Sequence, residues 1–206
     1  MILLLITVFV VCLCFRFPIA FSLGLSCLVY FFFKGTPLVV VPLKMYAGID
    51  VFVLLSIPGF IIAGNLMNQG GLTDKIINFC NHLLGHIRGG LSYVNISASM
   101  LFAGISGTAI SDTASLGAVM IPAMKKEGYD SDFSCAITAA SSTVGPIIPP
   151  SLPMIIAATL SGLSVGKLFL AGAIPGLLLG LGLMLVAYFV AKKKNYPKHP
   201  KSSLLQ

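Results

Sequence analysis

The residues best suited to binding lie in two short interruptions of otherwise apolar sequence. The first runs from Gly104 to Thr113 and is rich in glycine, serine and threonine. The second runs from Ser141 to Pro153 and contains four prolines and a glycine. Such sequences open helices, and opened helix ends expose carbonyl oxygens to a hard cation such as Na⁺ and N–H groups to an anion. The two interruptions therefore predict a site for a cation and an anionic molecule.

Asp112 is the only acidic residue inside these apolar stretches. An ionisable residue within a membrane segment is costly and commonly functional. A capping role for the following helix is the alternative, because Asp is favoured at helix N-termini. Satisfaction of helix ends is likewise the simpler alternative to ligand binding for Ser106, Thr108 and the run Ser141-Ser142-Thr143. Both interpretations stay open at the level of sequence.

A GxSG motif, Gly104-Ile105-Ser106-Gly107, matches the nucleophile motif of intramembrane serine proteases. Such a serine needs a base from a later membrane segment. His82 and His86 precede the motif, and His199 lies in the polar tail. The sequence therefore disfavours this enzyme, and we expect no catalytic residue and no cofactor beyond a coupling ion.

Composition explains why these interruptions stand out. Of the 206 residues, 57% are hydrophobic and only 9% are charged, whereas soluble domains are about 25% charged. Long unbroken apolar runs predict an all-α membrane protein rather than a barrel, whose strands alternate in polarity. The net charge of +7 comes from short segments between these runs and forms no basic patch among aromatic residues. We therefore expect membrane lipid, and no nucleic acid, as a partner.

The apolar runs divide the chain into expected elements. Residues 1–68 are predicted to be N-terminal transmembrane scaffold helices. Within residues 2–33, Arg16 and Pro18 favour two short spans, and one long kinked helix is the alternative. Residues 34–48 are expected to be a loop, and residues 50–68 a span with a kink at Pro58-Gly59. The remaining predicted segments are an amphipathic interfacial helix over 69–90, a re-entrant hairpin over 91–123, a broken transmembrane helix over 131–160, a loop over 161–167, a transmembrane helix over 168–191 and a cytoplasmic tail over 192–206.

Two of these segments are too interrupted to cross a bilayer as continuous helices. Each half of residues 91–123 is shorter than the roughly 20 residues that a span needs, and prolines break residues 131–160. Irregular backbone at membrane depth is tolerated only where it is buried or lines a wet cavity. We therefore place the expected binding site at these two breaks. By contrast, Gly172, Gly176 and Gly180 in the last span predict a close helix-packing face.

The distribution of cationic residues predicts an orientation. With two spans before Phe33, Lys34, Lys44 and Lys167 fall on one side of the membrane, and the rest of the 13 Lys and Arg residues fall on the other. The positive-inside rule assigns the richer side to the cytoplasm. The C-terminal tail is therefore expected to be cytoplasmic.

Several stretches of the chain are typical of one family of membrane proteins. They are Ile57–Met67, Gly85–Leu91, Phe102–Gly117, Ile121–Met124, Gly128–Asp130, Gly145–Ser151 and Leu168–Gly172. Over almost its whole length the chain resembles the large, M-type permease subunit of tripartite ATP-independent periplasmic (TRAP) transporters. The resemblance implies a symporter of the bacterial inner membrane that imports an organic acid with Na⁺. It implies as partners a periplasmic binding protein, which delivers the carboxylate substrate, and a small Q-type membrane subunit.

The resemblance also implies a fold and a site. Family members look like elevator-type carriers of the ion-transporter superfamily, built from two inverted repeats that each contain a re-entrant hairpin and a broken helix. It implies a Na⁺ site formed by Ser106, Gly107, Thr108, Ala109, Ser142, Thr143 and Gly145. It implies substrate contacts from Ser106, Thr108, Asp112, Ser141, Pro146 and Pro150.

The chain departs from the family in length. Family permeases are about twice as long, and the sequence here covers only the first repeat. We expect the second repeat to be a missing partner that supplies the second Na⁺ site and half of the substrate site. A fragment, a split gene, a truncated pseudogene and a pair of half-length chains are the alternatives, and residues 1–206 alone are predicted not to transport. A non-transporting membrane scaffold is the alternative function, and the sequence does not select among organic acids.

Overall fold

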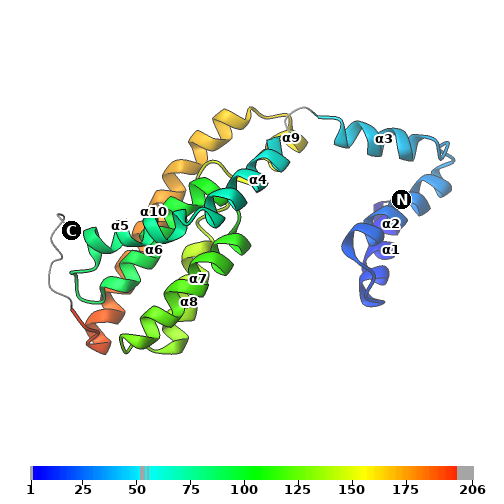
Figure 1. Cartoon of the computed structure of the whole chain (residues 1–206). Helices are drawn as coiled ribbons and strands as arrows, with labels where there is room; N and C mark the ends of the chain where they lie inside the picture. The colour runs from blue at the N-terminus through cyan, green and yellow to red at the C-terminus, as the bar shows by residue number, and fades with distance from the viewer. Residues whose placement is uncertain (1, 52–53, 55, 199–206) are drawn as a thin grey trace. The chain divides into compact units, whose positions relative to one another are not determined.

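The computed structural model describes residues 2–51, 54 and 56–198, and every regular element in that part of the chain is a helix. The chain forms two compact units, residues 1–51 and 52–206. Figure 1 labels the helices of both units, which are taken in turn below.

The first unit contains α1 (Ile2–Cys14), α2 (Ile19–Lys34) and α3 (Val40–Ile49). Helices α1 and α2 pack against each other, and Pro18 is the residue that precedes α2. The prediction of two helices in residues 2–33 is therefore confirmed, and the alternative of one long kinked helix is wrong.

The predicted loop over 34–48 is wrong from residue 40 onward, because α3 occupies that stretch. Pro42 is the third residue of α3. The first N–H groups of a helix have no partner within the helix, so a proline at this position removes no hydrogen bond. Pro42 and Gly48 therefore lie inside a helix, whereas Gly35 and Pro37 precede it.

The second unit contains seven helices among its described residues. They are α4 (Ser56–Gln69), α5 (Leu72–Leu84), α6 (Gly90–Ser106), α7 (Ala109–Lys126), α8 (Ser131–Ser142), α9 (Leu152–Ser161) and α10 (Val165–Lys194). The sequence predicts a span over 50–68; helix α4 begins at Ser56 within that stretch, and residues 52, 53 and 55 lie outside the described part of the chain. Pro58 is in the first turn of α4 rather than at a kink in mid-helix.

Helix α6 forms the centre of the second unit. It packs against α4, α5, α7, α8 and α10, and it contributes much of the buried core. Its fully buried apolar side chains are Val94, Ile96, Ala98, Phe102 and Ala103. Because five helices pack around α6, the position of its C-terminal residue, Ser106, is fixed by the core of the unit.

Two buried polar contacts join α6 to α8. The Asn95 side-chain amide donates to the Thr138 hydroxyl at 2.7 Å, and the Ser99 and Ser141 hydroxyls are hydrogen-bonded at 2.9 Å. The residue numbers of the second pair are higher than those of the first pair in both helices, so α6 and α8 run parallel. This arrangement fixes the register between the end of α6 and the end of α8.

Helix α5 is amphipathic, as predicted for residues 69–90. Ile76, Ile77 and Leu84 pack partly buried against the core of the second unit, whereas Lys75 and His82 are exposed.

Helix α7 continues through Pro122 to Lys126. It therefore ends three residues after residue 123, where we expected the hairpin segment to end.

Helix α10 is the one described helix that is long and apolar enough to cross a membrane; α1, α2, α3 and α9 are shorter apolar helices. It begins at Val165, inside the loop expected over 161–167. Gly172, Gly176 and Gly180 are buried on one side of it. A Cβ atom on Gly176 would lie 2.6 Å from the Ile148 side chain, which confirms the predicted close-packing face.

Candidate functional site at the hairpin link and the unwound segment

The link between α6 and α7 consists of Gly107 and Thr108. Gly107 has a left-handed φ of 61° and ends α6 by donating its N–H to the Ala103 carbonyl, a common form of helix end. The Thr108 hydroxyl accepts from the Ser111 N–H at 3.4 Å and caps α7. Thr108 therefore performs the helix-end role that the sequence offered as the simpler alternative.

Asp112 lies in the first turn of α7, with its side chain fully buried (0% exposed). Ser106 donates its hydroxyl to the Oδ1 atom of Asp112. The Oδ2 atom is buried and has no hydrogen-bond partner among the described residues. Thr108 rather than Asp112 caps the helix, so capping does not account for this acid. A buried carboxylate oxygen without a donor is costly, and a bound cation would remove that cost.

The unwound segment between α8 and α9, residues 143–151, approaches the first turn of α7 at Gly145. A Cβ atom on Gly145 would lie 2.7 Å from Asp112 Oδ2 and 3.1 Å from the Ser142 carbonyl oxygen. The absence of a side chain at this residue therefore lets the Asp112 carboxylate approach the backbone that follows α8. Three of the predicted site residues, Asp112, Ser142 and Gly145, come together here.

A second contact joins the link to the start of α9. A Cβ atom on Gly107 would lie 2.8 Å from the Pro150 carbonyl oxygen and 3.2 Å from the Leu152 nitrogen. The Ser151 hydroxyl donates to the Pro146 carbonyl at 2.5 Å and accepts from the Met154 N–H. Ser151 thereby caps α9 and fixes the path of the proline-rich segment against the link.

Other predicted residues point elsewhere. The Ser141 hydroxyl is bound to α6 through Ser99. The Ser142 hydroxyl donates to the Thr138 carbonyl at 2.9 Å, and it is the Ser142 carbonyl oxygen that lies near Gly145. Thr143 is exposed, and its hydroxyl donates to the Ala140 carbonyl at 2.7 Å. The structure therefore assigns these three hydroxyls to helix contacts.

A small pocket of about 120 Å³ opens beside the link. Its lining residues come from α4, from the hairpin and from α9: Ile61, Gly64, Asn65, Ser106, Thr108, Ser111 and Leu152. Its volume is that of roughly four water molecules in the liquid. A Cβ atom on Gly64 would lie 3.4 Å from the Ile105 carbonyl oxygen, so α4 closely approaches the end of α6.

A comparison with known families decides the identity. The family model described as "Tripartite ATP-independent periplasmic transporter, DctM component" matches residues 6–206. The chain belongs to the TRAP transporter large permease family.

Individual relatives agree with this assignment. The chain is 45% identical over 187 residues to the sialic acid TRAP transporter large permease protein SiaM of Vibrio cholerae, covering 90% of this chain and 44% of the relative. It is 46% identical to the sialic acid TRAP transporter permease protein SiaT of Haemophilus influenzae, covering 90% and 30%. It is 41% identical to the C4-dicarboxylate TRAP transporter large permease protein DctM of Pseudomonas aeruginosa, covering 89% and 43%. The chain thus spans less than half the length of these curated relatives.

Membership of the TRAP permease family confirms that the chain is not an enzyme, because the relatives are transporters. The geometry gives the GxSG motif a different role. Ser106 donates to Asp112 rather than to a histidine. The His82 Nδ1 atom donates to the Asn78 carbonyl within α5 at 2.7 Å. Ser106 is the last residue of α6, the helix that follows α5 in the chain.

Sequence reasoning missed two polar residues of this candidate site. Asn65 lines the pocket from α4, and Ser151 caps α9. Asn65 is a polar residue that interrupts the apolar part of α4 between residues 57–64 and 66–67, a signal that could have found it. Among the described residues no three His, Cys, Asp or Glu side chains gather. A cation at Asp112 would therefore depend mainly on carbonyl and hydroxyl oxygens, which suit hard ions.

Proposed function

We propose that this chain contributes the first half of the Na⁺ and carboxylate site of a TRAP large permease. In this proposal α6 and α7 are the two arms of a re-entrant hairpin, and α8 and α9 are the halves of a broken transmembrane helix. One observation carries the proposal. The buried Asp112 carboxylate has an unpartnered oxygen and faces Gly145 where the two helix breaks meet.

The coupling ion proposed for this point is Na⁺. Asp112 Oδ2 and the Ser142 carbonyl oxygen both lie near the space that a Gly145 side chain would take, and the Ser106 hydroxyl is bonded to the other carboxylate oxygen. The remaining members of the proposed set are Gly107, Thr108, Ala109, Thr143 and Gly145. A cation here would neutralise Asp112 and satisfy its free oxygen, which gives Na⁺ binding a physical reason.

The proposed substrate is an organic carboxylate. Relatives are named for sialic acid, for C4-dicarboxylates and for 2,3-diketo-L-gulonate. The pocket beside the link presents the hydroxyls of Ser106, Thr108 and Ser111, near the N-terminus of α7, where backbone N–H groups favour anions. Pro146 and Pro150 do not line this pocket and are proposed as substrate contacts on the resemblance to the family alone. Ser141 has the weakest support because it faces α6.

The proposed location and partners of the chain follow from its membership of the family. We propose residence in the bacterial inner membrane, with the tail after Lys194 in the cytoplasm, as the excess of Lys and Arg on that side favours. The proposed partners are a small Q-type subunit, a periplasmic binding protein that delivers the substrate, and a second permease repeat. The last is needed because the chain spans less than half of its relatives, whether it is a fragment or one of two chains.

Uptake by reconstituted proteoliposomes tests the proposal. The chain, a second repeat, a Q-type subunit and a binding protein should accumulate labelled organic acid only under an inward Na⁺ gradient. Ser106→Leu should abolish uptake, whereas Thr113→Leu, an exposed residue in the same helix pair, should preserve it. Uptake independent of Na⁺ would exclude the ion role, and normal uptake by Ser106→Leu would exclude the site. Co-purification of all subunits with neither uptake nor Na⁺ binding would support the scaffold alternative.

A further inference from the structure

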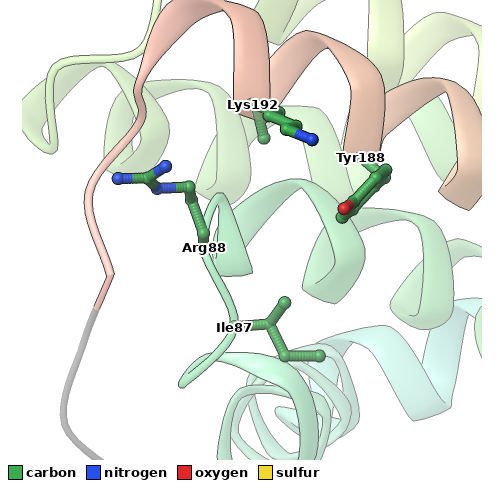
Figure 2. Close-up of a pocket in the computed structure, with 5 residues that line it drawn as sticks. Ile87, Arg88, Tyr188 and Lys192 are labelled. Carbon is green, nitrogen blue, oxygen red and sulfur yellow. The ribbon is translucent and has the colours of Figure 1, made fainter.

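A second pocket lies at the opposite end of α6 from the link between α6 and α7, beside the C-terminal part of α10. Its volume is about 160 Å³, and it is lined by Ile87, Arg88, Tyr188, Ala191 and Lys192. Figure 2 shows Arg88 on the turn before α6 and Tyr188 and Lys192 on α10, around this opening. Two cationic side chains and a phenol thus come from segments that are distant in sequence.

The turn that carries Arg88 is fixed against α10 at Gly89. Gly89 is buried, has a left-handed φ of 73° and donates its N–H to the Pro197 carbonyl at 3.0 Å. A Cβ atom on Gly89 would lie 2.5 Å from the Ala191 side chain. This close approach places the backbone of Arg88 next to the last turn of α10, so the pocket is built by packing and does not depend on a long flexible loop.

The two cations of this pocket have no acidic partner in the described part of the chain. Lys194, on the same turn of α10, forms an ion pair with Asp130. Neither Arg88 nor Lys192 forms an ion pair with a carboxylate of the described residues. Two unneutralised cations beside one opening favour an anion. The guanidinium fork of arginine matches the geometry of phosphate oxygens, and a lysine and a phenol can each add a further donor.

The face of α10 that leads away from the pocket is apolar. Leu181, Leu185, Tyr188 and Lys192 follow at steps of four, three and four residues, so they form one stripe along the helix. Leu181 is 50% and Leu185 is 59% exposed. An apolar stripe that ends in a tyrosine and then a lysine matches the depth profile of a lipid, with acyl chains below an anionic headgroup.

We propose that this pocket binds the phosphate of an anionic phospholipid, with Arg88 and Lys192 on the phosphate, Tyr188 at the ester level and the acyl chains along Leu181 and Leu185. Free phosphate could satisfy the cations but would leave the apolar stripe unused, so we assign the lipid. The site is separate from the proposed transport site and stands or fails independently of it.

Native mass spectrometry of the purified 206-residue chain tests the assignment. Protein in mild detergent is titrated with phosphatidylglycerol or with zwitterionic phosphatidylcholine, and bound lipid is counted as adducts. We expect preferential binding of phosphatidylglycerol. Arg88→Gln and Lys192→Gln should each weaken it by about five-fold, because a basic residue contributes about 1 kcal/mol near an anionic lipid surface. Arg88→Lys should restore most of the binding, and the charge-matched control Lys193→Gln should leave it unchanged.

Further arms separate the other occupants. Leu185→Ser should weaken binding of phosphatidylglycerol, and inorganic phosphate at the same concentration should not displace the lipid. Displacement by inorganic phosphate, with no effect of Leu185→Ser, would assign the pocket to free phosphate and overturn the proposal. An equal loss of phosphatidylglycerol binding in Lys193→Gln would mean that the lipid is attracted by diffuse charge and not held at this site. If Arg88→Gln and Lys192→Gln change the fraction of dimer in the same spectra but not the number of lipid adducts, the pocket is instead a contact between two copies of the chain, and the proposal is overturned.

Discussion

Replacement of Gly145 by alanine tests the meeting of the two helix breaks most directly. The new Cβ atom would lie 2.7 Å from Asp112 Oδ2, whereas ordinary contacts begin at 3.4 Å, so one group must move by about 0.7 Å. The second neighbour is the Ser142 carbonyl oxygen, which is backbone and cannot rotate away. Overpacking of this kind costs about 1–3 kcal/mol. Because the displaced oxygen is the proposed ion ligand, Na⁺ binding should weaken together with stability.

The assay is unfolding of the purified chain in mixed micelles, followed by circular dichroism, alongside equilibrium binding of radioactive Na⁺. Gly182→Ala is the matched control, because a Cβ atom on Gly182 has no neighbour within 4 Å. Alanine is also about 1 kcal/mol more favourable than glycine inside a helix. We therefore expect the control to be at least as stable as the native chain, with unchanged Na⁺ binding.

A double-mutant cycle identifies the cause. If the clash with the carboxylate dominates, Gly145→Ala should cost less in an Asp112→Ala background, with a coupling of about 1 kcal/mol or more between the two residues. Additive effects would refute the reasoning that Gly145 makes room for Asp112. Native stability of Gly145→Ala would refute the close approach itself.

Three further predictions address other contacts. Gly172→Ala should destabilise the chain more than Gly180→Ala in the same unfolding assay, because the new methyl group would lie 2.7 Å from a backbone oxygen in the first case and meet only a flexible methionine side chain in the second. Lys194 holds the pKa of Asp130 below its usual value through a hydrogen bond, so this contact should persist above pH 4 and be lost as the pH falls through the lowered pKa. The protection of residues 127–131 from hydrogen exchange, relative to the intrinsic rate at each pH, should then match that of Asp130→Asn at neutral pH. Ser106→Ala should weaken Na⁺ binding, measured as above, because the hydroxyl oxygen belongs to the proposed ligand set, and it should also lower stability because it leaves Asp112 Oδ1 without its donor; unchanged Na⁺ binding would remove Ser106 from the ligand set.

Sequence patterns predicted the helices best where apolar runs were long and had clear ends. The breaks at residues 15–18 and 143–151 follow from proline and glycine, whose backbone constraints act locally. The same reasoning failed for residues 40–49. A proline in the first turn of a helix has no local cost, so the sequence of α3 resembles that of a loop.

The candidate site was predictable as a region but not as a set of contacts. Ser and Thr residues at a helix end can bind a ligand, a neighbouring helix or their own backbone, and sequence does not distinguish these choices. Ser141 is bound to α6 and Thr143 to its own helix. The approach of Gly145 to Asp112 depends on how α7 packs against α8, which is a tertiary feature without a local signal. Asn65 was missed because α4 approaches the hairpin only in three dimensions.

The two hydrogen-bonded pairs between α6 and α8 limit how the second unit can move. A slide of α8 by one helical turn would break both the Asn95–Thr138 and the Ser99–Ser141 pairs, and each such pair is worth about 0.6–2 kcal/mol between helices in a membrane. These helices are therefore expected to travel as one rigid piece, carrying Ser106 and Gly145 with them. Any conformational cycle must then place its hinges outside this pair of helices, and the geometry around Asp112 can be the same at both ends of the cycle.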